Sequence, residues 1–147
     1  MAKEYKMPMS IVDIQECIPH RYPILLVDRI VDFSRDKFVK GIKNVTMTDP
    51  MIQGHFPGNP VWPGVLIVEG AAQTAAVFGV LCAEDTCTSF LLAEITSTRF
   101  RRPVVPGDTM LYDLQLKKRR GGFFWFDATV SVDSNIVAEL SFSARLQ

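Results

Sequence analysis

The feature that most constrains this chain is an almost continuously apolar run from Gly64 to Leu81. Its length is close to the ~20 residues that a membrane-spanning helix needs. The run nevertheless contains the polar residues Glu69 and Gln73, and prolines and glycines precede it. A helix of this kind fits better at the centre of a soluble domain, where neighbouring elements cover all its faces. The sequence therefore predicts one long buried helix and no membrane span.

The size and charge of the chain restrict what it can be. Its 147 residues suffice for one domain with one core, so we expect a single domain over residues 1–147. The formal net charge of +0 gives no reason to expect nucleic-acid binding, and any electrostatic docking must use a local patch. The N-terminal segment MAKEYKMPMS is polar and lacks the features of a secretory signal, so we expect a cytoplasmic protein.

The three cysteines, Cys17, Cys82 and Cys87, form an odd set without CxxC spacing. Neither a disulfide framework nor a metal site follows from such a pattern, since both use paired or clustered cysteines. We therefore expect reduced thiols in a reducing compartment and no bound metal.

The first half of the chain predicts one short helix and two strands before the long helix. Apolar spacing favours a helix over Ser10–Cys17, and apolar runs favour strands over Ile24–Val31 and Phe38–Val45. The stretch Thr48–Gly64 contains four of the nine prolines and predicts a long, stiffened loop. Pro63 would take the first helical position, which its fixed backbone angle favours.

The second half predicts four strands. The first covers Phe90–Phe100, and in the other three apolar residues alternate with polar ones between turn sequences. The alternating runs are Met110 to Leu116, Phe124 to Val132 and Ile136 to Leu146. A parallel sheet would need helices between its strands, and these are absent from the pattern. The predicted fold class is therefore α+β, with a curved antiparallel sheet around one long central helix.

A loop rich in proline and glycine holds His55 just before the long helix. Loops of this kind can position a polar side chain precisely enough for binding or catalysis. The backbone N–H groups at the helix start, around Gly64 and Val65, have no partner within the helix. They could hold a thioester carbonyl oxygen that gains negative charge.

Glu69 lies within the apolar helix, and Gln73 follows on the same face, close enough for a hydrogen bond. Apolar surroundings disfavour the charged form of a carboxyl group, which suits a proton donor near neutral pH. A histidine base, a carboxylic acid and backbone donors are what β-elimination requires. From these residues alone, a structural histidine and a glutamate paired with an arginine remain open. His20, the other histidine, is interpreted as structural.

Three motifs in register resemble one known family. They are GHFPGNPVWPGVLIVEGAAQ (Gly54–Gln73), PHRYPILLVD (Pro19–Asp28) and RFRRPVVPGD (Arg99–Asp108). Together they are similar to the FabZ-type 3-hydroxyacyl-[acyl-carrier-protein] dehydratases of type II fatty acid biosynthesis. The resemblance runs from about Ile11 to the C-terminus.

This resemblance implies a hot-dog fold and conversion of (3R)-3-hydroxyacyl-[acyl-carrier-protein] to the trans-2-enoyl product, without a cofactor. It implies that His55 acts with Glu69 of the partner subunit, and that the amides near Gly64 and Val65 bind the thioester carbonyl. Gln73, from its spacing on the helix, is the expected support for Glu69. It further implies a homodimer with active sites at the interface, assembled as a trimer of dimers. The partner would be an acyl carrier protein bearing a 3-hydroxyacyl-phosphopantetheine.

Basic residues form a group that stands out in a neutral protein. Their ordinary interpretation is a solvated strand end and hairpin, whereas the resemblance favours a docking surface for an acidic carrier protein. The residues are Arg99, Arg101, Arg102, Lys117, Lys118, Arg119 and Arg120. The aromatic run Phe123–Phe126 is expected in the core and at a subunit interface.

Several alternatives remain open at this stage. Trp62 and Gly70 depart from the usual family pattern, which leaves room for a specialised dehydratase of a secondary-metabolite pathway such as aryl polyene synthesis. Relatives of the FabA type carry aspartate where this chain has Glu69, so simple dehydration without isomerisation is favoured. A hot-dog thioesterase would leave the histidine loop without a role. A silent acyl-binding subunit would not need both His55 and Glu69.

Overall fold

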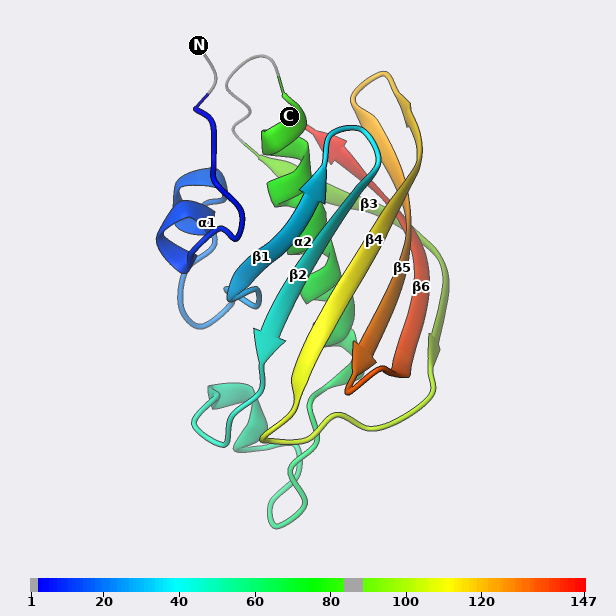
Figure 1. Cartoon of the computed structure of the whole chain (residues 1–147). Coiled ribbons are helices and arrows are strands. Elements are labelled where there is room, and N and C mark those ends of the chain that lie inside the picture. The colour runs from blue at the N-terminus through cyan, green and yellow to red at the C-terminus, as the bar shows by residue number, and fades with distance from the viewer. Residues whose placement is uncertain (1–2, 84–88) are drawn as a thin grey trace.

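The computed structural model describes residues 3–83 and 89–147, so Cys87 lies outside the described part of the chain (Figure 1). Two α-helices, one short 3-10 helix and six strands follow one another along these residues. In chain order they are α1 (Ile11–Cys17), β1 (Arg29–Ser34), β2 (Phe38–Asn44), η1 (Pro50–Ile52), α2 (Gly64–Cys82), β3 (Phe90–Phe100), β4 (Thr109–Arg120), β5 (Phe123–Val132) and β6 (Asn135–Leu146).

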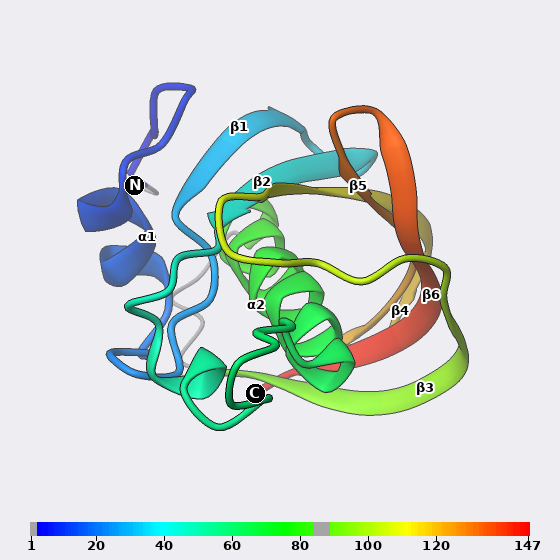
Figure 2. The ribbon, with the colours of Figure 1, turned by 90° about the horizontal axis from the view of Figure 1, so that it is seen from below.

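The strands form one sheet in the order β1-β2-β4-β5-β6-β3. Every neighbouring pair is antiparallel. The sheet curves around α2, as the view along the helix makes plain (Figure 2). The β4–β5 turn uses Gly121 and Gly122, both with positive φ (57° and 80°), a conformation that glycine adopts without a steric penalty. The predicted α+β architecture is confirmed.

Helix α2 forms the centre of the core. Its length and composition would permit a membrane span, but most of it is buried inside the domain. Phe78 makes edge-to-face contacts with Phe33, Phe124 and Phe126, at centroid distances of 5.7, 6.4 and 5.4 Å. Burying one such ring contributes about 1.5–3 kcal/mol. The apolar run is therefore the core helix of this domain.

The strand predicted over Ile24–Val31 was wrong in its first half, because β1 begins only at Arg29. Leu26 and Val27 are buried as a strand would bury them. However, the backbone N–H of Leu26 donates to the side-chain Oε1 of Gln73, at 2.7 Å, and not to a neighbouring strand. The Gln73 side chain from α2 therefore accepts the hydrogen bond that a neighbouring strand would otherwise accept.

The alternation predicted for the last strand was wrong at Ile136, whose side chain is 40% exposed. A β-bulge explains the difference. Val130 pairs with Ala138 and Ser131 pairs with Ile136, so Val137 has no residue opposite it on β5. The extra residue reverses the faces, and Val137 becomes buried in place of Ile136.

Candidate active site

The loop that carries His55 closes on itself through backbone hydrogen bonds. Phe56 and Asn59 exchange two N–H to carbonyl bonds, at 3.0 and 2.9 Å. The N–H of Val61 donates to the carbonyl of His55 at 2.8 Å. Gly58 adopts φ 72°, which the tight turn between these bonds requires. These contacts fix the position of His55 relative to the start of α2.

The imidazole of His55 has a defined orientation. Its Nδ1 lies 2.7 Å from the carbonyl oxygen of Val61. A carbonyl can only accept, so Nδ1 carries the proton, and in the neutral ring Nε2 keeps its lone pair. The ring also stacks on Phe56, with centroids 4.1 Å apart. A half-buried histidine held in this way is suited to accept a proton at Nε2.

The carboxyl group of Glu69 lies on α2 and is partly exposed in the single chain. Gln73, one turn further along, donates from Nε2 to Oε1 of Glu69 at 2.9 Å, which confirms the hydrogen bond expected from their spacing. The Gln73 side chain is itself buried. The buried amide of Gln73 thus fixes the position of the Glu69 carboxyl group through this hydrogen bond.

The start of α2 presents unpaired backbone donors. The helix begins at Gly64 with Pro63 as its N-cap, one residue later than predicted, and none of the described side chains caps it. The aromatic ring of Phe100 packs against Gly64, where an added Cβ would lie 3.0 Å from the ring. A cavity of about 350 Å³ opens beside this point, lined in part by Trp62, Gly64 and Phe100. Val65, the next residue, is exposed.

His55 and Glu69 are not brought together within one chain. Among residues 3–83 and 89–147, no hydrogen bond or ion pair joins them. The histidine that does reach Glu69 is His20, whose Nε2 lies 3.8 Å from Oε1. Sequence reasoning interpreted His20 as structural and missed this contact, because it joins residues far apart in the chain. The motif Pro19–Asp28 was the only available signal.

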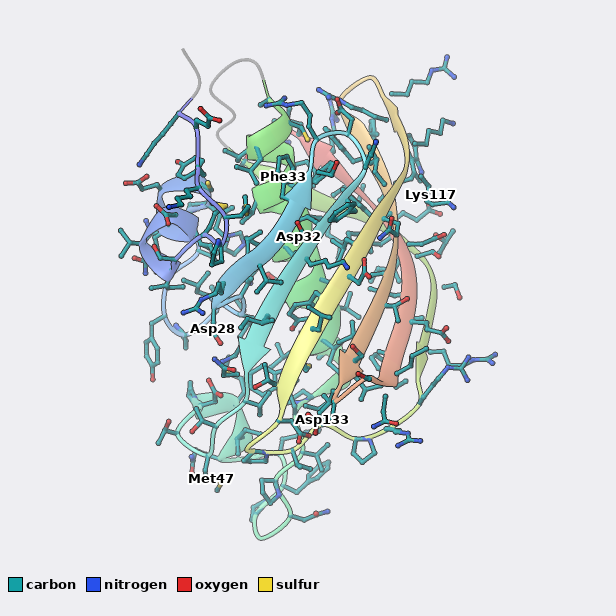
Figure 3. All side chains as sticks on the ribbon, viewed as in Figure 1. Asp28, Asp32, Phe33, Met47, Lys117 and Asp133 are labelled. Atoms are coloured by element: carbon teal, nitrogen blue, oxygen red, sulfur yellow. The ribbon has the colours of Figure 1, made fainter. Side chains whose placement is uncertain are left out.

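The basic residues predicted to form one docking cluster do not lie together. Lys117 to Arg120 are at the end of β4 next to the β4–β5 turn, whereas Arg99 to Arg102 are at the end of β3. Because these ends face opposite ways, the two groups occupy opposite ends of the sheet. Figure 3 shows Lys117 near one end and Asp133, in the β5–β6 turn, near the other. The prediction of a single cluster was wrong.

Several of these basic side chains are engaged with acidic neighbours. Arg101 pairs with Glu139 at 2.6 Å, Lys117 with Asp127 at 3.7 Å and Arg119 with Asp36 at 3.2 Å. Lys118 lies over the ring of Trp125, 4.9 Å from its centroid. In the described part of the chain, His, Cys, Asp and Glu side chains do not gather into a group that could hold a metal ion.

Residues 18–141 match the family model of the FabA-like domain. The chain belongs to the FabA-like family. Within it, the curated relatives include the 3-hydroxyacyl-[acyl-carrier-protein] dehydratase FabZ of a Nitratiruptor species, 42% identical over 94% of this chain and 97% of that protein. The FabZ of Syntrophotalea carbinolica is 45% identical, over 94% of this chain and 95% of that protein.

Solved structures agree on the fold of this FabA-like chain. The dehydratase heterocomplex ApeI:P from Xenorhabdus doucetiae superposes with a TM-score of 0.81 at 16% identity, covering 97% of this chain and 93% of the other. The E. coli PaaI protein of the phenylacetic acid degradation operon superposes with a TM-score of 0.57 at 18% identity, covering 79% and 80%. Because the sequence identities are this low, these superpositions concern the fold alone. They confirm the hot-dog fold.

Proposed function

We propose that this chain dehydrates (3R)-3-hydroxyacyl-[acyl-carrier-protein] to the trans-2-enoyl thioester in fatty acid biosynthesis. One observation carries the proposal: the 2.7 Å contact between His55 Nδ1 and the Val61 carbonyl, which leaves Nε2 as a base. The dehydratase names of the curated relatives support the same reaction. The reaction needs only side chains and backbone groups that the described chain supplies.

In the proposed reaction, Nε2 of His55 removes a proton from C2 of the substrate. The electrons move toward the thioester carbonyl, and its oxygen gains negative charge next to the N–H groups of Gly64 and Val65. Glu69 then gives a proton to the 3-hydroxyl group, the C3–O bond breaks, and water leaves as the C2–C3 double bond forms. His55 returns its proton and Glu69 regains one through solvent, so that the enzyme is unchanged.

We propose that each active site combines His55 of one chain with Glu69 of a second. The two side chains have separate sets of neighbours in the single chain, which supports a site shared between copies. Strand β3 is an edge strand, and its side chains Leu91 and Ile95 are 50% and 47% exposed. An open edge with exposed apolar residues favours pairing with another copy. The proposed assembly is a homodimer, and further a trimer of dimers.

A complementation experiment tests the shared site. His55→Ala and Glu69→Gln are each purified inactive, mixed, unfolded and refolded together. A hybrid dimer then holds one site with both native residues and one with neither. Random pairing restores about a quarter of the sites in a two-fold symmetric dimer. Activity that stays at the level of the separate variants would show that both groups act within one chain.

For the carrier protein, we propose docking at the end of the sheet that holds Arg99, Arg101 and Arg102. Arg101 and Arg102 line the cavity beside the start of α2, where the thioester would enter. The second basic group, at the β4–β5 turn, lies at the far end and is not needed for this docking. The proposed location of the enzyme is the cytoplasm, where the carrier protein would meet it.

The reaction itself is tested by incubating the protein with 3-hydroxybutyryl and longer 3-hydroxyacyl carrier proteins. Enoyl absorbance reports dehydration, and free thiol reports hydrolysis of the thioester. We expect enoyl product without free thiol. Free thiol without enoyl product would identify a thioesterase, and neither product would point to a silent acyl-binding subunit. The rates across chain lengths separate a housekeeping enzyme from a specialised one.

A further inference from the structure

His20 reaches the carboxyl group of Glu69 from a different part of the fold. It belongs to the loop that follows α1, yet its Nε2 lies 3.8 Å from Glu69 Oε1. The His20 side chain is 24% exposed and that of Glu69 is 31% exposed, so water screens the contact only in part. His20 also lines a small, largely apolar cavity with Ala76 and Phe90. The polar imidazole in these mostly apolar surroundings therefore calls for an explanation.

The Gln73 amide has one possible orientation, and it defines which oxygen of Glu69 receives donors. Oε1 of Gln73 accepts from the N–H of Leu26 at 2.7 Å. Its Nε2 donates to the carbonyl of Ile24 at 2.6 Å and to Glu69 Oε1 at 2.9 Å. Turning the amide over would set its oxygen against two acceptors and its NH₂ against a donor. Gln73 is therefore a fixed donor to Oε1.

The His20 ring faces the same oxygen, with its Nε2 3.8 Å from Oε1. Its Nδ1 is buried and has no hydrogen-bond partner among the described residues. A proton on Nδ1 would be a buried donor without an acceptor, whereas a proton on Nε2 faces Glu69 Oε1. The neutral ring therefore favours the Nε2–H form. Gln73 donates to Oε1, and the Nε2 of His20 faces the same oxygen at 3.8 Å, which is longer than a hydrogen bond. Both groups therefore gather on Oε1, and Oε2 is the oxygen that would carry a proton.

We propose that His20 is a positioning residue for Glu69: its ring lies against Oε1 beside the hydrogen bond from Gln73, so that the transferable proton resides on Oε2. This inference rests on the proposed dehydratase function and deepens it. His20 does not touch the reacting atoms. It determines the rotation of the carboxyl group, and therefore whether the proton faces the 3-hydroxyl of the substrate.

Two variants and one control test the role of His20. His20→Phe keeps a ring without N–H donors, and His20→Gln keeps an N–H donor of similar reach. We expect His20→Phe to lower kcat by roughly 10- to 100-fold with KM within about 2-fold, because only orientation is lost. His20→Gln should recover most of this loss. Tyr22→Phe, in the same loop but 82% exposed, should behave as the unmodified protein.

The double variant His20→Phe/Glu69→Gln separates positioning from a general structural effect. If His20 acts through Glu69, removing His20 should not lower the residual activity of Glu69→Gln any further. The proposal is overturned if His20→Phe lowers the activity of Glu69→Gln by the same factor as it lowers the activity of the otherwise unmodified protein. A kcat of His20→Phe close to the unmodified value would also overturn it, as would a large rise in KM that His20→Gln shares.

A measurement on the unmodified protein does not depend on any variant folding. Imidazole nitrogen shifts in a ¹⁵N-histidine spectrum distinguish the two neutral forms of His20. The Nε2–H form supports the proposal, and the Nδ1–H form overturns it. If the unmodified protein dehydrates no 3-hydroxyacyl substrate, the proposed function fails, whereas this spectrum still decides where the His20 proton lies.

Discussion

The phenol of Tyr112 on β4 occupies the space that Gly70 leaves open on α2. A Cβ added to Gly70 would lie 2.0 Å from the Tyr112 hydroxyl oxygen and 2.5 Å from the adjacent ring carbon. Tyr112 is fully buried, and burial raises the pKa of its phenol, so the group is neutral throughout the physiological range. Gly70 directly follows Glu69, so this contact sets how closely the carboxyl-bearing turn of α2 approaches the sheet.

We predict that Gly70→Ala destabilises the protein by about 1–3 kcal/mol, because the methyl group overpacks a rigid aromatic contact. It should also lower kcat by displacing Glu69. Denaturant unfolding measures the first effect, and the enoyl assay the second. Gly54→Ala is the matched control for stability, since an added Cβ there meets nothing within 4 Å. The double variant Gly70→Ala/Tyr112→Met should lose less unfolding free energy than the two single variants lose together. Strictly additive losses would argue against the contact.

The proposed acid–base pair predicts large and separate losses of turnover. His55→Ala removes the ring whose Nδ1 is held by Val61, and Glu69→Gln keeps the shape of the side chain without its acid function. Each should lower kcat by about two or more orders of magnitude. Circular dichroism and thermal unfolding should remain close to those of the unmodified protein. Near-normal turnover in either variant would remove that residue from the mechanism.

Most strands were predictable because their signal is local. In β4 and β5, alternate residues such as Met110 and Phe126 carry the inward face, and the turn residues between strands are also readable from the sequence. The start of β1 was not predictable, because the backbone of Leu26 is satisfied by Gln73 from a distant helix. The exposure of Ile136 depends on a bulge that no local pattern reveals.

The same distinction applies to the site. His55, Gly64 and Glu69 fall within one continuous motif, so their proximity in the chain made them recognisable. The contact between His20 and Glu69 arises only when α1 and its loop pack against α2. The sequence prediction wrongly treated the two basic groups as one cluster. Residues at the ends of two different strands need not lie at the same end of the sheet, and the sequence does not show at which end each strand finishes.

We predict that replacing Lys43, which lies outside the site, has a large effect on the stability of the fold. Its side chain is almost fully buried, and its Nζ lies 2.8 Å from the Asn44 carbonyl and 3.2 Å from Asp49. Lys43→Met would leave the mostly buried Asp49 carboxylate without its cation, which should cost about 3–5 kcal/mol. Lys40→Met breaks a more exposed pair with Asp113 and should cost at most about 1 kcal/mol. Equal costs in urea unfolding would contradict this difference.

The exposed edge of β3 leads to a prediction of how the proposed oligomer responds to charge. Ile95→Lys places a cation on an exposed apolar position of this edge, which opposes pairing between strands. We expect a lower mass by light scattering and a loss of activity in parallel, since the proposed site needs two chains. Val12→Lys, a comparably exposed position on α1, is the control and should leave the mass unchanged. An Ile95→Lys protein of unchanged mass would place the interface elsewhere.

The N-terminus of α1 predicts a pH-dependent contribution to stability. Ser10 donates from its hydroxyl and its backbone N–H to Asp13, and these bonds lower the pKa of the Asp13 carboxyl. The stabilisation is therefore present above the unfolded-state value of about 3.9 and is lost as the pH falls through the lower folded value. Asp13→Asn should be less stable than the unmodified chain at a pH of about 6, with the difference shrinking in strong acid. A difference in Tm that stays constant from near-neutral pH into strong acid would contradict this assignment.

The open edge of β3 also concerns the newly synthesised chain. If the chain pairs with a second copy as proposed, the exposed apolar side chains of Leu91, Leu92 and Ile95 on this edge strand stay open to any strand nearby until that copy arrives. Correct assembly and aggregation then compete for the same surface, and the outcome depends on how soon two folded chains meet. Overproduction from a strong promoter would raise the encounter rate of folded and unfolded chains alike, so the yield of soluble protein should depend on the rate of synthesis as well as on the stability of the fold.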